Sequence, residues 1–326
     1  MKIETKATMD TREDVLAAML RIRAFETKLE WLYSKGMLGG TSHLCIGQEA
    51  SAVGVIHRLK PDDYVVSSHR GHGHMIAKGG DIGRMFGELL GKSNGYCGGK
   101  GGSQHLCAKE IGFYGTNGIT AGGIPIATGL ALAAKLDASP KIGVAFFGDG
   151  ATAQGTFHES LNIAALWGLP IMYVCENNLY SMSTPLSRTS SVQDLTRKAG
   201  AYDIESGSVD GTDVVAVREI ARRAVDYVRG KSRPFLLEVK TYRHCGHSKS
   251  DPRVYRSKEE EQEWKDRDCI ESCKSRLLDD GYSAMALEEL QRGIEREVDD
   301  ALNETLQIEN APLDTALKGV YGDERV

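Results

Sequence analysis

Residues 142–178 carry the sequence IGVAFFGDGATAQGTFHESLNIAALWGLPIMYVCENN, and this stretch decides the fold. Ile142–Phe147 and Pro170–Cys175 are continuous apolar runs, which are typical of strands buried on both faces of a parallel sheet. Thr156–Leu166 lies between them and has the apolar spacing of a helix. This order predicts a βαβ unit with a right-handed crossover.

Two polar motifs follow the strands of this unit. A Gly-Asp-Gly turn at residues 148–150 follows the first strand, and an Asn-Asn pair at residues 177–178 follows the second. Ligands of parallel sheets bind at the carboxyl ends of strands, and neighbouring strands lie about 4.8 Å apart. Asp149 and Asn178 are therefore expected to reach one ion.

Magnesium suits such a site because it takes oxygen ligands and keeps some of them from phosphate and water. Glycines in the turn let backbone N–H groups point at phosphate, and the positive end of a following helix favours an anion. Either motif alone would be an ordinary tight turn. Their positions at the two ends of one βαβ unit predict a site for magnesium and a diphosphate.

The rest of the chain extends this unit into an α/β fold, a parallel sheet flanked by helices. Helices are expected at Asp14–Tyr33, Glu49–Leu59, Ile124–Leu136 and Val214–Val228, and further strands at Tyr64–Ser67 and Pro234–Tyr242. Residues 91–123 are rich in glycine and are expected to form a long functional loop. Since no linker or repeat interrupts the chain, we predict one domain over residues 1–326, with a helical C-terminal extension over about residues 257–326.

Composition excludes several classes of protein. The net charge of −5 argues against a nucleic-acid-binding protein, which is usually basic. No segment approaches the roughly 18–20 apolar residues that cross a membrane, and the polar N-terminus has no apolar signal core. The seven cysteines are odd in number and include no Cys-x-x-Cys pair, so reduced thiols and a cytoplasmic location are expected.

Beyond the two motifs, the flanking sequences resemble a known family. Residues 165–170 (ALWGLP), 175–180 (CENNLY) and 247–252 (HSKSDP) resemble the alpha subunit of the thiamine diphosphate-dependent first component of 2-oxo acid dehydrogenase complexes. The resemblance extends from about Leu20 to Arg256, and the pyruvate and acetoin members are most similar. It implies the thiamine diphosphate-binding fold, with thiamine diphosphate and Mg²⁺ as cofactors.

The implied activity is oxidative decarboxylation of a pyruvate-like 2-oxo acid, with transfer of the acyl group to a lipoyl group. Cleavage of acetoin by an acetoin dehydrogenase is the alternative within the family. A free-standing thiamine-dependent lyase or transketolase is a weaker alternative, because those chains are usually far longer. A non-enzymatic nucleotide-binding protein lacks support, since the sequence has neither a Gly-x-Gly-x-x-Gly nor a Walker loop.

The resemblance also assigns individual residues. The metal ligands are the side chains of Asp149 and Asn178 and the backbone carbonyl of Tyr180. The residues matched to cofactor binding are His69, Arg70, Gly118, Thr120, Gly150, Ala151, Asn178, Met182 and His247. Among these, Arg70 suits a diphosphate because its guanidinium can form two parallel hydrogen bonds to phosphate.

His43 and His247 match catalytic histidines of the family, and histidine can exchange protons near neutral pH. A zinc cluster of histidines is the competing interpretation of this region, with the candidate ligands His69, His72, His74 and His105. The cation of Arg70 lies among them in the sequence and would oppose a metal ion.

One part of the family's machinery has no match here. The family activates its cofactor with a glutamate against the pyrimidine ring, and in two-chain members this residue lies on a separate beta subunit. The resemblance therefore implies a beta subunit in an alpha–beta heterotetramer, together with a lipoyl acyltransferase component. The chain alone is expected to be inactive.

The substrate stays open between pyruvate, acetoin and another oxo compound. Thr41 stands where pyruvate members have a phenylalanine, two residues before His43. The smaller threonine removes an apolar wall, which favours a larger or hydroxylated substrate. Residues 69–78 look more like the acetoin members, whereas residues 182–185 do not.

Overall fold

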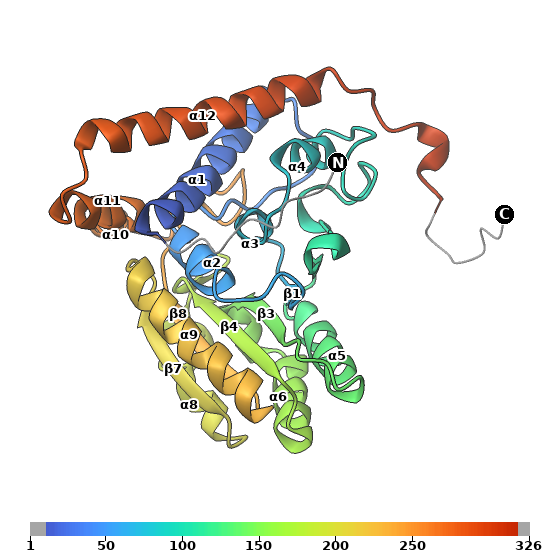
Figure 1. Ribbon diagram of the computed structural model, residues 1–326, viewed down its shortest axis with the longest axis vertical. Helices are drawn as coiled ribbons and strands as arrows, with labels where there is room; N and C mark the ends of the chain where they lie inside the picture. Colours follow the sequence, from blue (N-terminus) through green and yellow to red (C-terminus); the bar gives the residue numbers. More distant parts are fainter. Residues whose placement is uncertain (1–10, 319–326) are drawn as a thin grey trace.

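The computed structural model describes residues 11–318, so both ends of the predicted domain lie partly outside the described residues. A six-stranded sheet forms the centre, in the order β2-β1-β3-β4-β8-β7, and all of its strand pairs are parallel (Figure 1). Its strands are β1 (Tyr64–Val66), β2 (Phe113–Gly115), β3 (Gly143–Gly148), β4 (Ile171–Asn177), β7 (Glu205–Asp210) and β8 (Phe235–Lys240). The predicted α/β fold with a parallel sheet is confirmed.

The predicted βαβ unit is present as β3, the helix α6 (Gly155–Trp167) and β4. The strands β3 and β4 are neighbours in parallel register, with Gly148 opposite Glu176. Alternate residues of β3 enter two different cores: Val144 and Phe146 pack into one, and Ala145 and Phe147 into the other. This burial on both faces explains the continuous apolar run in the sequence.

Helices cover both faces of the sheet. One core is built with α1 (Arg12–Ser34), α2 (Glu49–Ile56) and α9 (Val214–Lys231), and the other with α5 (Gly123–Leu136), α6 and α8 (Thr196–Gly200). Shorter elements are α3 (His72–Ala77), α4 (Ile82–Leu89), α7 (Leu186–Thr189) and a hairpin of β5 (Tyr180–Ser181) and β6 (Thr184–Pro185). The helices predicted at residues 14–33, 49–59, 124–136 and 214–228 are present with end shifts of a few residues.

The C-terminal extension contains α10 (Lys258–Asp266), α11 (Cys269–Asp279) and α12 (Ala284–Leu306), as predicted. In Figure 1 the helix α12 runs across α1 and α4, against which it packs. Beyond α12 the chain returns to the glycine-rich segment: the Ser93 N–H donates to the Glu309 carbonyl at 3.0 Å, and the Ala311 N–H donates to the Gly91 carbonyl at 2.8 Å.

The sequence patterns missed the short hairpin of β5 and β6 and two strands of the central sheet. The strand β2 lies inside residues 91–123, which were expected to be a loop throughout, and its three residues are too few to show an alternation. The strand β7 has the polar sequence Glu-Ser-Gly-Ser-Val-Asp and lies at the edge of the sheet. None of its residues is fully buried, so it needs no apolar face. Within residues 11–318, no helix is both long and apolar enough to cross a membrane.

Candidate functional site

A cavity of about 280 Å³ opens at the carboxyl ends of β3 and β4. It is lined by Ser68, His69, Arg70, Thr120, Ala121, Phe147, Gly148, Asp149, Gly150, Ala151, Gln154, Glu176, Asn178, Tyr180, Ser181, Met182, Arg243 and His247. All predicted site residues except His43 and Gly118 are in this lining. A larger hollow of about 460 Å³ lies between α1 and α12, but none of the motif residues line it.

Oxygen atoms that suit a metal ion line the cavity. Asp149 is 2% exposed, and burial raises the pKa of its carboxyl group. Asn178 donates its side-chain amide to Gln48 Oε1 at 2.9 Å, so its Oδ1 is oriented as an acceptor. A bound cation would offset the cost of burying the Asp149 carboxylate, and the donor set therefore fits a hard metal ion.

The turn at residues 148–150 requires glycine at its third position. A Cβ atom on Gly150 would lie 2.3 Å from Ser181 Oγ, which itself donates to Asp149 Oδ2 at 3.2 Å. The helix predicted at Thr156–Leu166 is present after this turn, although not directly after it. A 3-10 turn over Asp149–Ala153 intervenes, and α6 begins only at Gly155. The backbone at the turn is therefore tighter than the end of an α-helix.

Two buried arginines supply positive charge to the same cavity. Arg70 is 4% exposed and donates to the carbonyls of Leu44 and His247. Arg243 is 1% exposed and donates to the Met182 carbonyl at 3.3 Å. Burial lowers the pKa of both guanidinium groups, and the charge of Arg70 further lowers the pKa of Arg243. An anion between them would relieve this repulsion, so the cavity favours an anionic ligand.

Arg243 was missed by the sequence analysis. It follows β8, the neighbour of β4, at the same carboxyl edge of the sheet. A search for polar residues after every predicted strand would have found it. Glu176, the second carboxylate in the lining, was also not singled out, and its Oε1 lies 3.2 Å from His74 Nε2.

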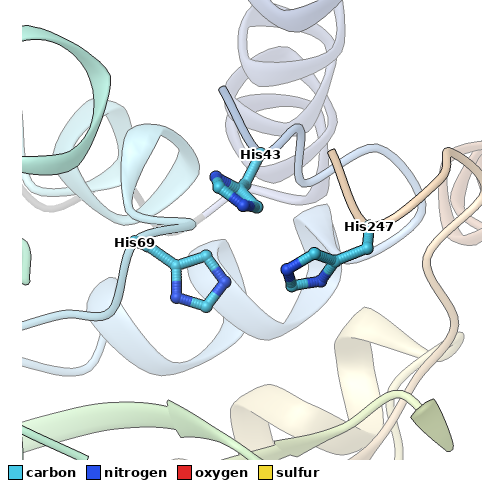
Figure 2. A group of neighbouring side chains, drawn as sticks. All are labelled: His43, His69 and His247. Atoms are coloured by element: carbon cyan, nitrogen blue, oxygen red, sulfur yellow. The ribbon is translucent and has the colours of Figure 1, made fainter. Parts of the chain in front are cut away.

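Three histidine rings lie together beside the cavity (Figure 2). The ring centroids of His43 and His69 are 4.5 Å apart, and those of His43 and His247 are 4.8 Å apart. Burial and the neighbouring arginines lower the pKa to about 3 for His43, about 2 for His69 and about 4 for His247. All three rings are therefore neutral at pH 7.

The arrangement of these histidines favours an anion over a metal ion. Their ring nitrogens lie within 4.8 Å of one another. However, Arg70 donates to the His247 carbonyl at 3.1 Å, and Arg243 Nη1 lies 3.4 Å from His247 Nδ1. Two guanidinium groups at this distance repel a bare metal cation.

Two of the four histidines of the zinc alternative, His72 and His74, are engaged elsewhere. His72 contacts Glu26 Oε1 at 3.0 Å and Ser103 Oγ at 2.9 Å through its two ring nitrogens. Both nitrogens of His74 are likewise hydrogen-bonded, to Ser67 and Glu176. Neither ring has a nitrogen left for zinc, which agrees with the argument against this alternative.

Two residues singled out in the sequence, Gly118 and Thr41, lie outside the cavity lining. Gly118 packs against the side chain of Gln104 rather than lining the cavity. Thr41 is exposed and also lies outside the lining.

The second motif is held rigidly, because Asn177 donates to Glu238 Oε1 at 2.7 Å inside the sheet. All seven cysteines are free thiols, as expected.

Comparison with known proteins identifies a family match over most of the chain. Residues 17–313 match the family described as Dehydrogenase E1 component. The chain is 42% identical over 286 residues to the alpha subunit of an acetoin:2,6-dichlorophenolindophenol oxidoreductase from Bacillus subtilis, covering 87% of this chain and 86% of the relative.

Two further relatives are named alpha subunits of a pyruvate dehydrogenase E1 component. The protein from Rhizobium meliloti is 42% identical over 317 residues, which cover 96% of this chain and 90% of the relative. The protein from Rickettsia felis is 41% identical over 317 residues, covering 96% of both chains. These similarities extend well beyond the motif that first suggested the site.

Proposed function

The chain belongs to the dehydrogenase E1 component family, and on this premise we propose that it is the alpha subunit of a thiamine diphosphate-dependent oxidoreductase. Its reaction is the oxidative decarboxylation of a pyruvate-like 2-oxo acid, with transfer of the acyl group to a lipoyl group. Cleavage of acetoin is the second candidate, because an acetoin oxidoreductase subunit is as similar as the pyruvate dehydrogenase subunits. The single observation that carries the proposal is one cavity lined both by metal-binding oxygens and by two buried arginines.

In the proposal, Asp149, Asn178 and the Tyr180 carbonyl hold Mg²⁺, and the tight backbone at Gly150 and Ala151 contacts the diphosphate. Arg70 and Arg243 lie where they can neutralise its charge, and His69 and His247 can donate to it. Gly118, Thr120 and Met182 are proposed to contact the organic part of the cofactor. Bound thiamine diphosphate would supply a carbon nucleophile toward the substrate carbonyl and an electron sink for decarboxylation.

The chain's own groups then orient the substrate and exclude water. The rings of His43 and His247 are neutral, so each can donate one hydrogen bond and accept another without carrying charge. The two buried arginines favour a substrate carboxylate as well as a phosphate. A 2-oxo acid carries that carboxylate, whereas acetoin does not, and we therefore place the 2-oxo acid first.

A partner subunit is part of the proposal. The described carboxylates that line the cavity are Asp149 and Glu176, and the second is already bonded to His74. Large apolar side chains are exposed near the rim, with Ile119 at 72% and Met182 at 63%. We propose that a beta subunit covers this rim, supplies the activating glutamate and forms an alpha–beta heterotetramer. A lipoyl acyltransferase would accept the acyl group. We also propose that the chain forms a single domain and that the complex is cytoplasmic.

Reduction of a dye tests the proposed function. The chain is assayed alone and after co-expression with the beta subunit, with thiamine diphosphate, Mg²⁺ and either pyruvate, longer 2-oxo acids or acetoin. Turnover is expected only from the complex. Asp149→Asn should abolish most of it, whereas Asp203→Asn, at a 99% exposed carboxylate, serves as the matched control and should not.

Two results would contradict the proposal. Activity of the chain alone would show that the beta subunit is not needed for activation, and Glu176 would become the candidate for that role. A complex that binds the cofactor but reduces the dye with none of these substrates would reject the reaction itself.

A further inference from the structure

Gln104 is the one side chain of the glycine-rich segment that reaches a predicted catalytic histidine. Its amide Nε2 lies 3.2 Å from His43 Nδ1. Its Oε1 lies over Gly118, where a Cβ atom would come within 2.8 Å of it. Glycine at residue 118 thus leaves the space that the Gln104 amide occupies.

The backbone that carries Gln104 is held by buried polar contacts. Its neighbour Ser103 contacts His72 Nε2 at 2.9 Å and Ser42 Oγ at 3.2 Å, and Ser42 directly precedes His43. His72 in turn contacts the fully buried Glu26 at 3.0 Å. These contacts tie the residue before Gln104 to the residue before His43. Gln104 therefore faces His43 from a fixed position.

We propose that Gln104 is a positioning residue that donates an amide hydrogen to Nδ1 of His43 and so holds its proton on Nε2. A neutral imidazole has one N–H and one acceptor nitrogen, and the hydrogen bond made by one nitrogen decides the role of the other. With Nδ1 accepting from Gln104, Nε2 of His43 is a hydrogen-bond donor. This inference rests on the proposed function.

The surroundings of His43 support the neutral ring that this requires. Burial, together with the positive charges of Arg70 and Arg243, lowers its pKa to about 3. The ring of His69 also packs against it, with 4.5 Å between ring centroids. No carboxylate is among these neighbours, so a charged imidazolium is disfavoured at neutral pH.

A donor at Nε2 matches the chemistry of the proposed substrate. The carboxylate and carbonyl oxygens of a 2-oxo acid can only accept hydrogen bonds. In the opposite tautomer His43 would offer them a lone pair, which repels oxygen. Gln104 thus converts His43 from a general base into a hydrogen-bond donor for the substrate.

Two nearly isosteric substitutions distinguish the tautomers. Gln104→Met removes the hydrogen bond, and in the reconstituted complex it should lower kcat/KM about fivefold, the value of one net hydrogen bond. Gln104→Glu can only accept, and its carboxylate also raises the pKa of His43. Assayed at a pH above that pKa, it draws the proton of the neutral ring onto Nδ1 and should cost about a hundredfold or more, since a wrong tautomer is severe. The expected order of activity is therefore Gln, then Met, then Glu.

The same variants in a His43→Gln background separate positioning from packing. Both losses should disappear there, because the ring they act on is gone. Losses that persist in this background would overturn the proposal, and so would a Gln104→Glu enzyme as active as the parent. If Gln104→Glu does not fold, the Gln104→Met cycle with His43→Gln decides alone.

A spectroscopic measurement tests the inference without any turnover. The complex is reconstituted with this chain labelled with ¹⁵N-histidine, and the signal of His43 is identified by its loss in His43→Gln. The ¹⁵N shifts should show a protonated Nε2 and an unprotonated Nδ1, and a proton on Nδ1 would overturn the proposal. An inactive complex that shows the expected tautomer would reject the proposed reaction but support the position of the proton.

Discussion

The carboxylate of Glu88 is expected to control the order of the glycine-rich segment. It is 1% exposed, and its two oxygens accept four backbone N–H groups: those of Cys97 at 2.6 Å, Gly99 at 2.9 Å, Gly101 at 2.6 Å and Gly102 at 3.2 Å. A single side chain thus holds the backbone of residues 97–102, which belongs to no strand and no α-helix. Glu88→Gln is the smallest change that disturbs it.

The size of the effect follows from this hydrogen-bond pattern. The glutamine side chain has one oxygen and one amide group, so two of the four N–H donors lose their acceptor. Hydrogen bonds to a charged group contribute about 1.5–3 kcal/mol each, and water replaces part of the lost pair. We expect local opening to become easier by about 3 kcal/mol, which is roughly a hundredfold in the opening equilibrium.

Hydrogen–deuterium exchange measures this opening. In Glu88→Gln, amides of residues 97–102 should exchange about a hundredfold faster than in the parent protein. Glu110→Gln is the matched control, because Glu110 pairs with Arg84 at 2.9 Å while 54% exposed. That change should leave the exchange of the segment unaltered, since surface ion pairs contribute little. Unchanged exchange in Glu88→Gln would refute the idea that this carboxylate orders the segment.

Three further predictions concern other parts of the chain. Thr41→Phe should lower kcat/KM for longer 2-oxo acids at least about fivefold relative to pyruvate, since it restores a bulky wall; an unchanged ratio in the dye assay would remove this residue from substrate selection. Burial lowers the pKa of His57 from 6.5 to about 4, so its contribution to the free energy of unfolding is fully present above pH 6.5 and is lost as the pH drops toward 4. In urea unfolding, His57→Gln should lose less stability than the parent protein over this range, by up to about 3 kcal/mol. Glu260 accepts the Tyr180 hydroxyl at 2.9 Å, so Glu260→Ala should weaken Mg²⁺ activation about tenfold through displacement of the tyrosine, whereas the exposed Glu259→Ala should not; equal Mg²⁺ titrations would contradict this coupling.

The sequence was sufficient to predict the centre of the sheet. Val144 and Phe146 face one core while Ala145 and Phe147 face the other, and burial on both faces leaves a signal that a single sequence displays. The strand β7 left no such signal, because an edge strand needs no apolar face on the solvent side.

Most of the predicted site residues gather in one cavity because they follow neighbouring strands, and the ends of parallel strands meet at one edge. The contact between Gln104 and His43 could not be predicted in this way. It depends on a segment whose path is set by the distant Glu88 and not by local hydrophobic spacing. The spacing of apolar residues in a sequence carries no information about loop geometry of this kind.

The return of the chain after α12 has a consequence for synthesis on the ribosome. Gly91 and Ser93 form backbone hydrogen bonds with Ala311 and Glu309, which are translated long after the sheet strands have emerged. The glycine-rich segment therefore cannot complete its contacts in the nascent chain. Completion of the candidate site is therefore a late event in synthesis, so a chain that stalls before Glu309 would carry a formed sheet but an unfinished site.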